Sequence, residues 1–182
     1  MQIRHLNSEH YKVSQWSGGT TTEVFIWPEG ANYATRELSL RISSATVDLE
    51  ESDFTPLPGV IRYIVPLQGG FTLTHPGEAS VVMAPLSAPY RFSGGIATHC
   101  VGRATDFNLM LKGVEGEMDI CRDVAPILPG MTCLYAPAEC RVWVLGEDHA
   151  LKAGESLLIF SEETAAAQVD GTVIRCYATL AK

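Results

Sequence analysis

The sequence predicts an all-β protein, a sandwich or a barrel, on three observations. Short segments rich in β-branched and aromatic residues recur along nearly the whole chain of 182 residues. The 16 glycines and 10 prolines separate these segments as turn residues and do not gather in a linker. Only SEETAAAQ, residues 161–168, has the composition of a helical turn. Many short strands with almost no helix are typical of a sandwich or a barrel.

The expected strands are short apolar or alternating runs, and each is bounded by turn sequences such as QGG, HPGE, SGG, LPG and KAGE. In chain order they are 22–27, 37–47, 60–68, 71–75, 79–84, 96–102, 106–112, 117–123, 140–146, 155–160 and 172–180.

Composition narrows the classes of partner. The formal net charge is −8 and no basic run is present, which argues against binding to nucleic acid or to an anionic membrane surface. The N-terminal residues contain no apolar segment of the signal-peptide type, and no stretch has the length of a membrane span. We therefore expect a cytoplasmic protein.

The five cysteines agree with that expectation. Their number is odd and no CxxC pair occurs, so a disulfide framework is not expected. Free cysteines usually behave as small buried hydrophobic residues. His99 beside Cys100 does not make a catalytic pair, because neighbours in a strand point to opposite faces.

A degenerate internal repeat predicts two similar lobes. Residues 59–82 read as a strand, a Gly-Gly hairpin, a strand, a Pro-Gly turn and another strand. Residues 140–160 repeat this order and have the shape of a cupin half. We therefore predict a cupin-like double-stranded β-helix, or jelly roll, in a bicupin arrangement. The boundary is expected at KGVEGE, which gives an N-terminal lobe over 1–115 and a mainly structural C-terminal lobe over 116–182.

An ordered set of motifs resembles the HutD/Ves family, bacterial cupin-fold proteins linked by name to histidine utilisation and to environmental stress. The motifs cover the first two thirds of the chain, and beyond residue 115 only the cupin-like pattern continues. They are GGTTTEV (18–24), LRISSATV (40–47), FTPLPGVIRYIVPLQG (54–69), RFSGG (91–95) and DFNLM (106–110).

The chain departs from the family pattern at two places. The glycine-rich segment here reads SQWSGGTTTEV, so that Trp16 stands two positions later than usual and the family's asparagine is missing. Ile61 occupies the position before Arg62 at which the family usually carries an acidic residue. Both departures bear on the choice of ligand.

Metal and phosphate chemistry find little support in the sequence. None of the five histidines stands at the His-x-His spacing of metal-binding cupins, so no metal and no cofactor are expected. SGGTTTE resembles a phosphate-binding loop, but no lysine follows it and no helix begins there. It is either a glycine turn entering a strand or the rim of a binding site, lined by its backbone N–H groups or by the threonine hydroxyls of 20–22.

Polar residues instead recur on strands that otherwise look buried. Arg41 and Ser43 share one face of 37–47, and Asp106 and Asn108 share one face of 106–112. These faces are either outer and solvated, with weak surface pairs, or they line a cavity. The family motifs favour the cavity. The candidate ligand-binding residues are Thr21, Glu23, Arg41, Ser43, Arg62, Asp106 and Asn108.

Burial limits what such a cluster can do. A desolvated arginine costs several kcal/mol unless it is paired, so Glu23 and Asp106 either neutralise one arginine each in a structural network or leave part of one guanidinium unpaired. An unpaired guanidinium binds a carboxylate through parallel hydrogen bonds. Asn108 would then bind an amide, formyl or imidazole group of the same ligand.

Two functions follow as hypotheses. The family resemblance implies a non-enzymatic binder of a small carboxylate, such as urocanate or formylglutamate, with a regulatory role in histidine utilisation or stress response. The alternative is a metal-free cupin enzyme, an isomerase or hydrolase, with Glu23 or Asp106 as base beside Arg41 or Arg62. Exposed edge strands also favour a homodimer, although no sequence feature locates its interface.

Overall fold

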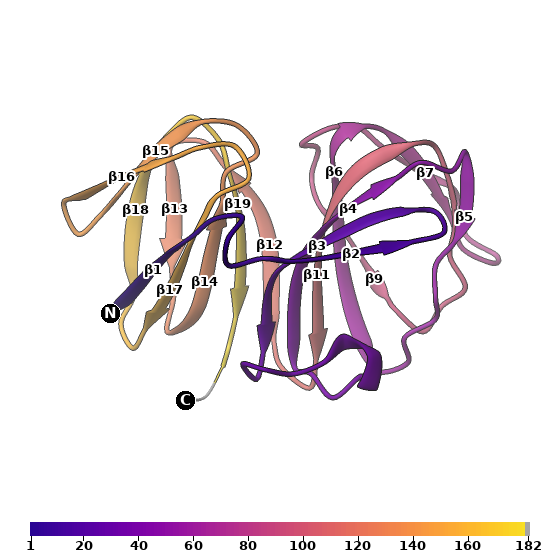
Figure 1. Cartoon of the computed structure of the whole chain (residues 1–182), viewed down its shortest axis with the longest axis horizontal. Coiled ribbons are helices and arrows are strands. Elements are labelled where there is room, and N and C mark those ends of the chain that lie inside the picture. Colours follow the sequence, from indigo (N-terminus) through magenta and orange to yellow (C-terminus); the bar gives the residue numbers. More distant parts are fainter. Residues whose placement is uncertain (181–182) are drawn as a thin grey trace. The chain divides into compact units, whose positions relative to one another are not determined.

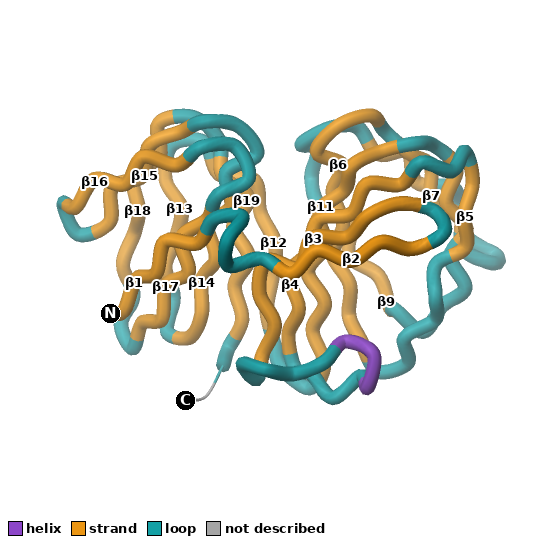
Figure 2. The backbone as a smooth tube through the Cα atoms, viewed as in Figure 1, coloured by secondary structure: helices purple, strands orange, loops and turns teal. Residues whose placement is uncertain are grey.

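The computed structural model describes residues 1–180 and confirms the all-β prediction. Strands make up most of the backbone, and the only helix among the described residues is a single 3₁₀ turn, η1 (Tyr33–Thr35) (Figure 2). The chain divides into two compact units. The N-terminal unit is Lys12–Gly113, and the C-terminal unit comprises Met1–Tyr11 together with the chain from Val114 onwards.

The N-terminal unit consists of two antiparallel sheets. Its larger sheet has the strand order β2-β3-β4-β11-β6-β9, and its smaller sheet has the order β5-β10-β7-β8 (Figure 1). The large sheet contains β2 (Lys12–Trp16), β3 (Gly19–Trp27), β4 (Leu40–Val47), β11 (Ala104–Lys112), β6 (Val60–Gly69) and β9 (Tyr90–Ser93). The small sheet contains β5 (Glu51–Asp53), β10 (His99–Val101), β7 (Phe71–Thr74) and β8 (Val81–Met83).

The C-terminal unit also consists of two antiparallel sheets, in the orders β1-β17-β14-β19-β12 and β13-β18-β15-β16. The first contains β1 (Gln2–Leu6), β17 (Ser156–Ser161), β14 (Gly130–Tyr135), β19 (Val173–Ala178) and β12 (Gly116–Cys121). The second contains β13 (Val124–Ile127), β18 (Ala165–Asp170), β15 (Cys140–Val144) and β16 (Glu147–Leu151). Two units of two sheets each fit the bicupin arrangement.

The helical turn expected at 161–168 is absent, and that prediction is wrong. The segment instead leads into β18, which pairs with β13 and β15. Ala167 and Val169 alternate with exposed neighbours and are buried in the core of the C-terminal unit. Long-range pairing and the burial of alternate residues here outweigh the helical preference of a run of alanines.

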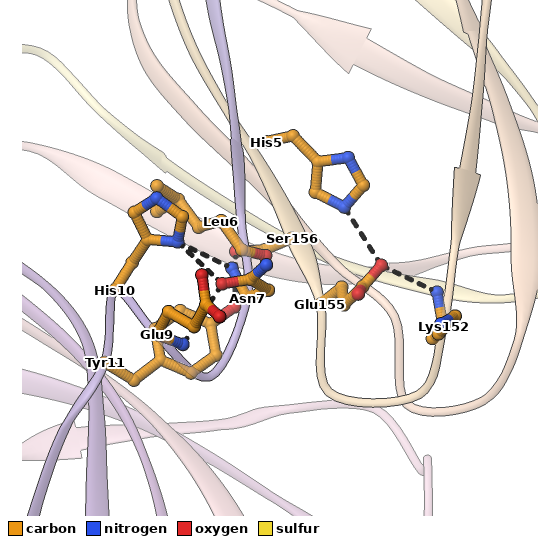
Figure 3. Close-up of polar contacts among 9 residues, drawn as sticks. All are labelled: His5, Leu6, Asn7, Glu9, His10, Tyr11, Lys152, Glu155 and Ser156. Atoms are coloured by element: carbon orange, nitrogen blue, oxygen red, sulfur yellow. Dashed lines mark hydrogen bonds and ion pairs between the residues drawn. The ribbon is translucent and has the colours of Figure 1, made fainter.

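The first eleven residues lie with the C-terminal unit, although the sequence analysis placed them in the N-terminal lobe. β1 pairs with β17, which lies near the other end of the sequence, and Ile3 stands opposite Ile159. Two polar contacts hold the segment. His5 Nε2 lies 2.9 Å from Glu155 Oε2, as Figure 3 shows, and the Tyr11 hydroxyl lies 2.9 Å from Ser156 Oγ. A strand partner so distant in sequence has no local signature.

Each unit has its own apolar core. The core of the N-terminal unit includes Ile64 of β6 and Phe71 and Leu73 of β7. The core of the C-terminal unit includes Leu134, Leu157 and other residues of both of its sheets.

All five cysteines are free and buried, as predicted. Burial raises the pKa of the Cys100 thiol to about 11 and that of Cys133 to about 12. Both thiols therefore stay protonated near neutral pH and are poor nucleophiles. No helix within residues 1–180 combines the length and the apolar character that a membrane crossing requires.

Candidate functional site

The polar face of β11 lines a cavity of about 420 Å³ in the N-terminal unit. β11 is buried on both faces, with Phe107 and Leu109 on one side and Asp106, Asn108 and Met110 on the other. The second set lines the cavity. The alternation in this strand therefore places a carboxylate and an amide inside the protein, because strand side chains point to opposite faces in turn.

Six of the seven predicted residues line this cavity, and the seventh contacts one of the six. The strand register explains the grouping, because Arg41 and Arg62 both lie opposite Met110 from the two strands that flank β11. The lining residues are Thr21, Arg41, Ser43, Arg62, Asp106 and Asn108. Glu23 does not line the cavity but binds Arg41.

Arg62, Asn108 and Asp106 form a buried chain of hydrogen bonds. Arg62 Nη2 donates to Asn108 Oδ1 at 2.9 Å, and Asn108 Nδ2 donates in turn to Asp106 Oδ1. The amide thus lies between the guanidinium and the carboxyl group, using its acceptor toward one and its donor toward the other. No direct ion pair between Arg62 and Asp106 is formed.

This environment changes the acidity of Asp106 strongly. Burial raises the pKa of its carboxyl group to about 7, although the charge of Arg62 and the hydrogen bond from Asn108 both act to lower it. Burial also lowers the pKa of Arg62, partly offset by the attraction of Asp106. Near neutral pH the Asp106 carboxyl is therefore divided between its protonated and ionised forms.

Arg62 retains unused donors. Its guanidinium carbon lies 4.6 Å from the centroid of the Phe54 ring and 5.3 Å from that of Phe92. Nε is enclosed and has no hydrogen-bond partner within residues 1–180. Nη1 also has no partner in that range, but it is not fully enclosed. Since Arg62 lines the cavity, Nη1 is the donor that an incoming acceptor can reach.

Arg41 is more fully paired than Arg62. Its Nε donates to Glu23 Oε2 at 2.7 Å, and both side chains of this ion pair are largely buried. Nη1 makes a longer contact of 3.4 Å with Ser43 Oγ. The guanidinium carbon also lies 4.0 Å from the centroid of the Tyr33 ring. Glu23 and Arg41 thus realise the internally neutralised pair that the sequence allowed, whereas the guanidinium of Arg62 binds no carboxylate directly.

Further residues, which the sequence pattern did not predict, enter the cavity from loops and turns. Tyr33 belongs to η1, Arg36 follows η1, and Phe54 follows the short strand β5. None of them belongs to an alternating run, so periodicity gives no signal for them. Trp16, at the end of β2, also lines the cavity. Among residues 1–180, no group of three or more His, Cys, Asp or Glu side chains is arranged to hold a metal ion.

Two-sheet antiparallel units, one of them with a cavity that several polar side chains line, define a protein of the cupin class. The chain belongs to the HutD family, whose model matches residues 8–177. A search among curated proteins finds no match.

Solved structures agree with this class. The fold is similar to that of HutD from Pseudomonas fluorescens SBW25, determined in a formate condition, with a TM-score of 0.83, 24% identity and full coverage of both chains. A conserved protein of Pseudomonas aeruginosa PAO1 gives a TM-score of 0.82 at 21% identity, again over both full chains. A cupin 2 barrel protein from Leptotrichia buccalis gives 0.60 at 10% identity, covering 100% of this chain and 98% of its own.

Proposed function

We propose that the cavity of the N-terminal unit binds a small carboxylate of the urocanate or formylglutamate type and does not convert it. Bound ligand would then act as a regulatory signal in histidine utilisation or stress response. The observation that carries the proposal is Arg62 Nη1, a guanidinium donor without a hydrogen-bond partner among residues 1–180, on a side chain that lines the cavity. Carboxylates are the ligands that such a donor binds most strongly.

Two further facts support this proposal. The family resemblance links the chain by name to histidine utilisation, and the HutD structure of Pseudomonas fluorescens was determined in a formate condition. Formate is the smallest carboxylate, and its charge and planar oxygens are those that an arginine side chain recognises. Asn108 lies beside Arg62 and carries both donor and acceptor atoms for the remainder of a larger ligand.

A thermal-shift screen tests the binding. Urocanate, N-formylglutamate, formate, histidine and glutamate are added in turn to the full chain. A ligand that binds only the folded state stabilises it by about 2.7 kcal/mol at a hundredfold excess over its dissociation constant. We expect at least one carboxylate to raise the unfolding midpoint of the wild type, and Arg62→Gln to abolish that rise.

Arg91→Gln is the matched control. Arg91 is exposed on β9 and lies outside the cavity, so its removal changes the net charge equally without touching the site. A shift that survives Arg62→Gln, or that disappears equally in Arg91→Gln, would contradict carboxylate binding at this cavity. If the bound carboxylate acts as a regulatory signal, the Arg62→Gln variant should alter the induction of histidine-degrading enzymes in the cell. We expect this effect to be as strong as that of deleting the gene.

One observation favours the second candidate function, a metal-free enzyme. Burial raises the pKa of Asp106 to about 7, the range in which a general base works best near neutral pH, and Arg62 lies close enough to stabilise a developing negative charge. Glu23 is the weaker base candidate because Arg41 binds its carboxylate. Incubation with each carboxylate distinguishes the two functions. A binder returns the compound unchanged, whereas an enzyme gives turnover that Asp106→Asn removes.

A further inference from the structure

The loop between β3 and β4, residues 28–38, contains η1 and contributes Tyr33 and Arg36 to the lining of the N-terminal cavity (Figure 2). The two ends of the loop meet, because Ser39 N donates to the carbonyl oxygen of Trp27 at 2.8 Å. Within the loop, Arg36 N donates to the carbonyl oxygen of Tyr33 at 3.2 Å and closes η1. A surface loop whose ends lie close together and which packs on itself is an Ω-loop, a type that is frequently functional.

Tyr33 attaches this loop to the large sheet of the N-terminal unit. The guanidinium carbon of Arg36 lies 3.8 Å from the centroid of the Tyr33 ring, and that of Arg41 lies 4.0 Å from it. Two guanidinium groups at nearly the same distance over one ring lie on its opposite faces, because they would overlap on the same face. Arg36 belongs to the loop, whereas Arg41 belongs to β4. The contact between Tyr33 and Arg41 therefore joins the loop to the sheet.

Side chains, and not strand pairing, hold the centre of the loop in place. Lys112 Nζ, at the end of β11, donates to the carbonyl oxygen of Arg36 at 2.9 Å, and this hydrogen bond is exposed to solvent. The Tyr33 ring also packs against an apolar cluster of Leu57, Val60 and Met110. Most other residues of the loop are exposed. A segment with few buried side chains opens at a lower free energy than the strands around it.

We propose that residues 28–38 form a lid on the N-terminal cavity and that Tyr33 is the latch that keeps this lid closed against Arg41. Arg62 and Asn108, which line the same cavity, are buried when the lid is closed. Opening moves Tyr33 away from β4, together with the rest of the loop, and exposes the cavity to solvent. The lid thus controls access to the site, and this inference rests on the binding function proposed above only for the ligand that is admitted.

Limited digestion of the full chain with trypsin measures the opening, because the bond between Arg36 and Glu37 is a cleavage site inside the lid. In the closed lid the Arg36 side chain lies on Tyr33 and its carbonyl oxygen binds Lys112, so both contacts must break before trypsin cuts. When opening and closing are faster than cleavage, the cleavage rate follows the open population. We expect Tyr33→Leu, which stays apolar but loses the ring, to accelerate this cut about tenfold, the effect of losing a partly buried cation–π contact.

Two controls make the result specific. Tyr33→Phe retains the ring and should be cut after Arg36 at the rate of the wild type. Cleavage after Arg91 is the internal reference, because Arg91 lies on β9 of the same unit and a strand must unfold before trypsin cuts it. Its rate should be the same in all three proteins. Equal rates after Arg36 in the wild type and Tyr33→Leu, or equal acceleration after Arg36 and Arg91, would overturn the latch.

Added ligand separates failure of the lid from failure of the proposed function. Urocanate, N-formylglutamate and formate are each added to the wild type before trypsin. A carboxylate that raises the unfolding midpoint should also slow the cut after Arg36, because the lid closes over it. A carboxylate that raises the midpoint but leaves this cut unchanged would overturn the lid, while binding that depends on Arg62 would stand. If no carboxylate binds, the binding function is wrong, and the effect of Tyr33→Leu still decides for or against the latch.

Discussion

Replacing Asp106 by asparagine is expected to remove a large part of the pH dependence of the N-terminal unit's stability between pH 4 and pH 8. The pKa of Asp106 is about 7 in the folded protein, against an ordinary value of 3.8. Between these two values the folded state holds a proton that the unfolded state has released. The free energy of unfolding therefore falls as the pH rises through this window.

The expected magnitude follows from the two pKa values. At about 1.4 kcal/mol for each pKa unit, the difference amounts to about 4 kcal/mol of stability, present at pH 4 and lost by pH 8. Asparagine resembles the protonated carboxyl group and can still accept the hydrogen bond from Asn108. Asp106→Asn should therefore match the wild type near pH 4 and exceed its stability near pH 8.

Urea unfolding at a series of pH values measures this difference. A Trp143→Phe background leaves tryptophan fluorescence only in the N-terminal unit, because the chain's other tryptophans are Trp16 and Trp27. At each pH, the free energy of unfolding of the wild type is subtracted from that of the variant. This subtraction removes the contribution of all other titrating groups, because both proteins contain them. If the free energies of unfolding of the two proteins change in parallel with pH, folding does not raise the pKa of Asp106. That result would contradict the burial of its carboxyl group in this network.

A second large loss of stability is expected in the C-terminal unit when the acidic partners of Arg175 are removed. The Arg175 side chain is buried there, with 1% of its surface exposed. Its Nη1 donates to Glu117 at 2.8 Å and to Asp119 at 2.6 Å, and its Nε donates to the carbonyl oxygen of Pro126 at 2.7 Å. Removing the acidic partners leaves a buried guanidinium uncompensated, which typically costs about 3–5 kcal/mol. Both acids are half-exposed, so water replaces part of the interaction and the lower end of this range is expected.

The double variant Glu117→Ala/Asp119→Ala should therefore lower the free energy of unfolding of this unit by about 3 kcal/mol. Adding Arg175→Met should recover most of that loss, because an apolar side chain of similar length needs no ionic partner. Trp143 reports on this unit in a background with Trp16→Phe and Trp27→Phe. A triple variant that is no more stable than the double would mean that Arg175 contributes through packing and not through its charge.

Much of the candidate site in the N-terminal unit could be predicted from the sequence because its residues lie on strands. Period-two alternation assigns the faces of β4, β6 and β11, and the register then brings Arg41 and Arg62 opposite the same residue of β11. Local sequence does not determine which strand faces are enclosed. Alternation alone therefore also allowed the polar faces to lie on the outside, in contact with water. Burial of Asp106 and Asn108 in the structure excludes that arrangement.

Other parts could not be predicted because their determinants are not local. Arg36 and Tyr33 reach the cavity from a 3₁₀ turn without a repeating pattern. β14 is a run of buried residues without alternation and was not among the expected strands. β1 depends on a partner at the opposite end of the sequence. In each case tertiary pairing or burial decides the conformation, and short-range propensity does not.

The most direct test of carboxylate binding is a crystal structure of the full chain soaked with the carboxylate that gives the largest thermal shift. We expect one carboxylate group of that ligand to lie within hydrogen-bonding distance of Arg62 Nη1, beside Asn108 and inside the N-terminal cavity. A cavity that holds no carboxylate, or a ligand bound on another surface while Arg62 remains unpaired, would contradict carboxylate binding at this site.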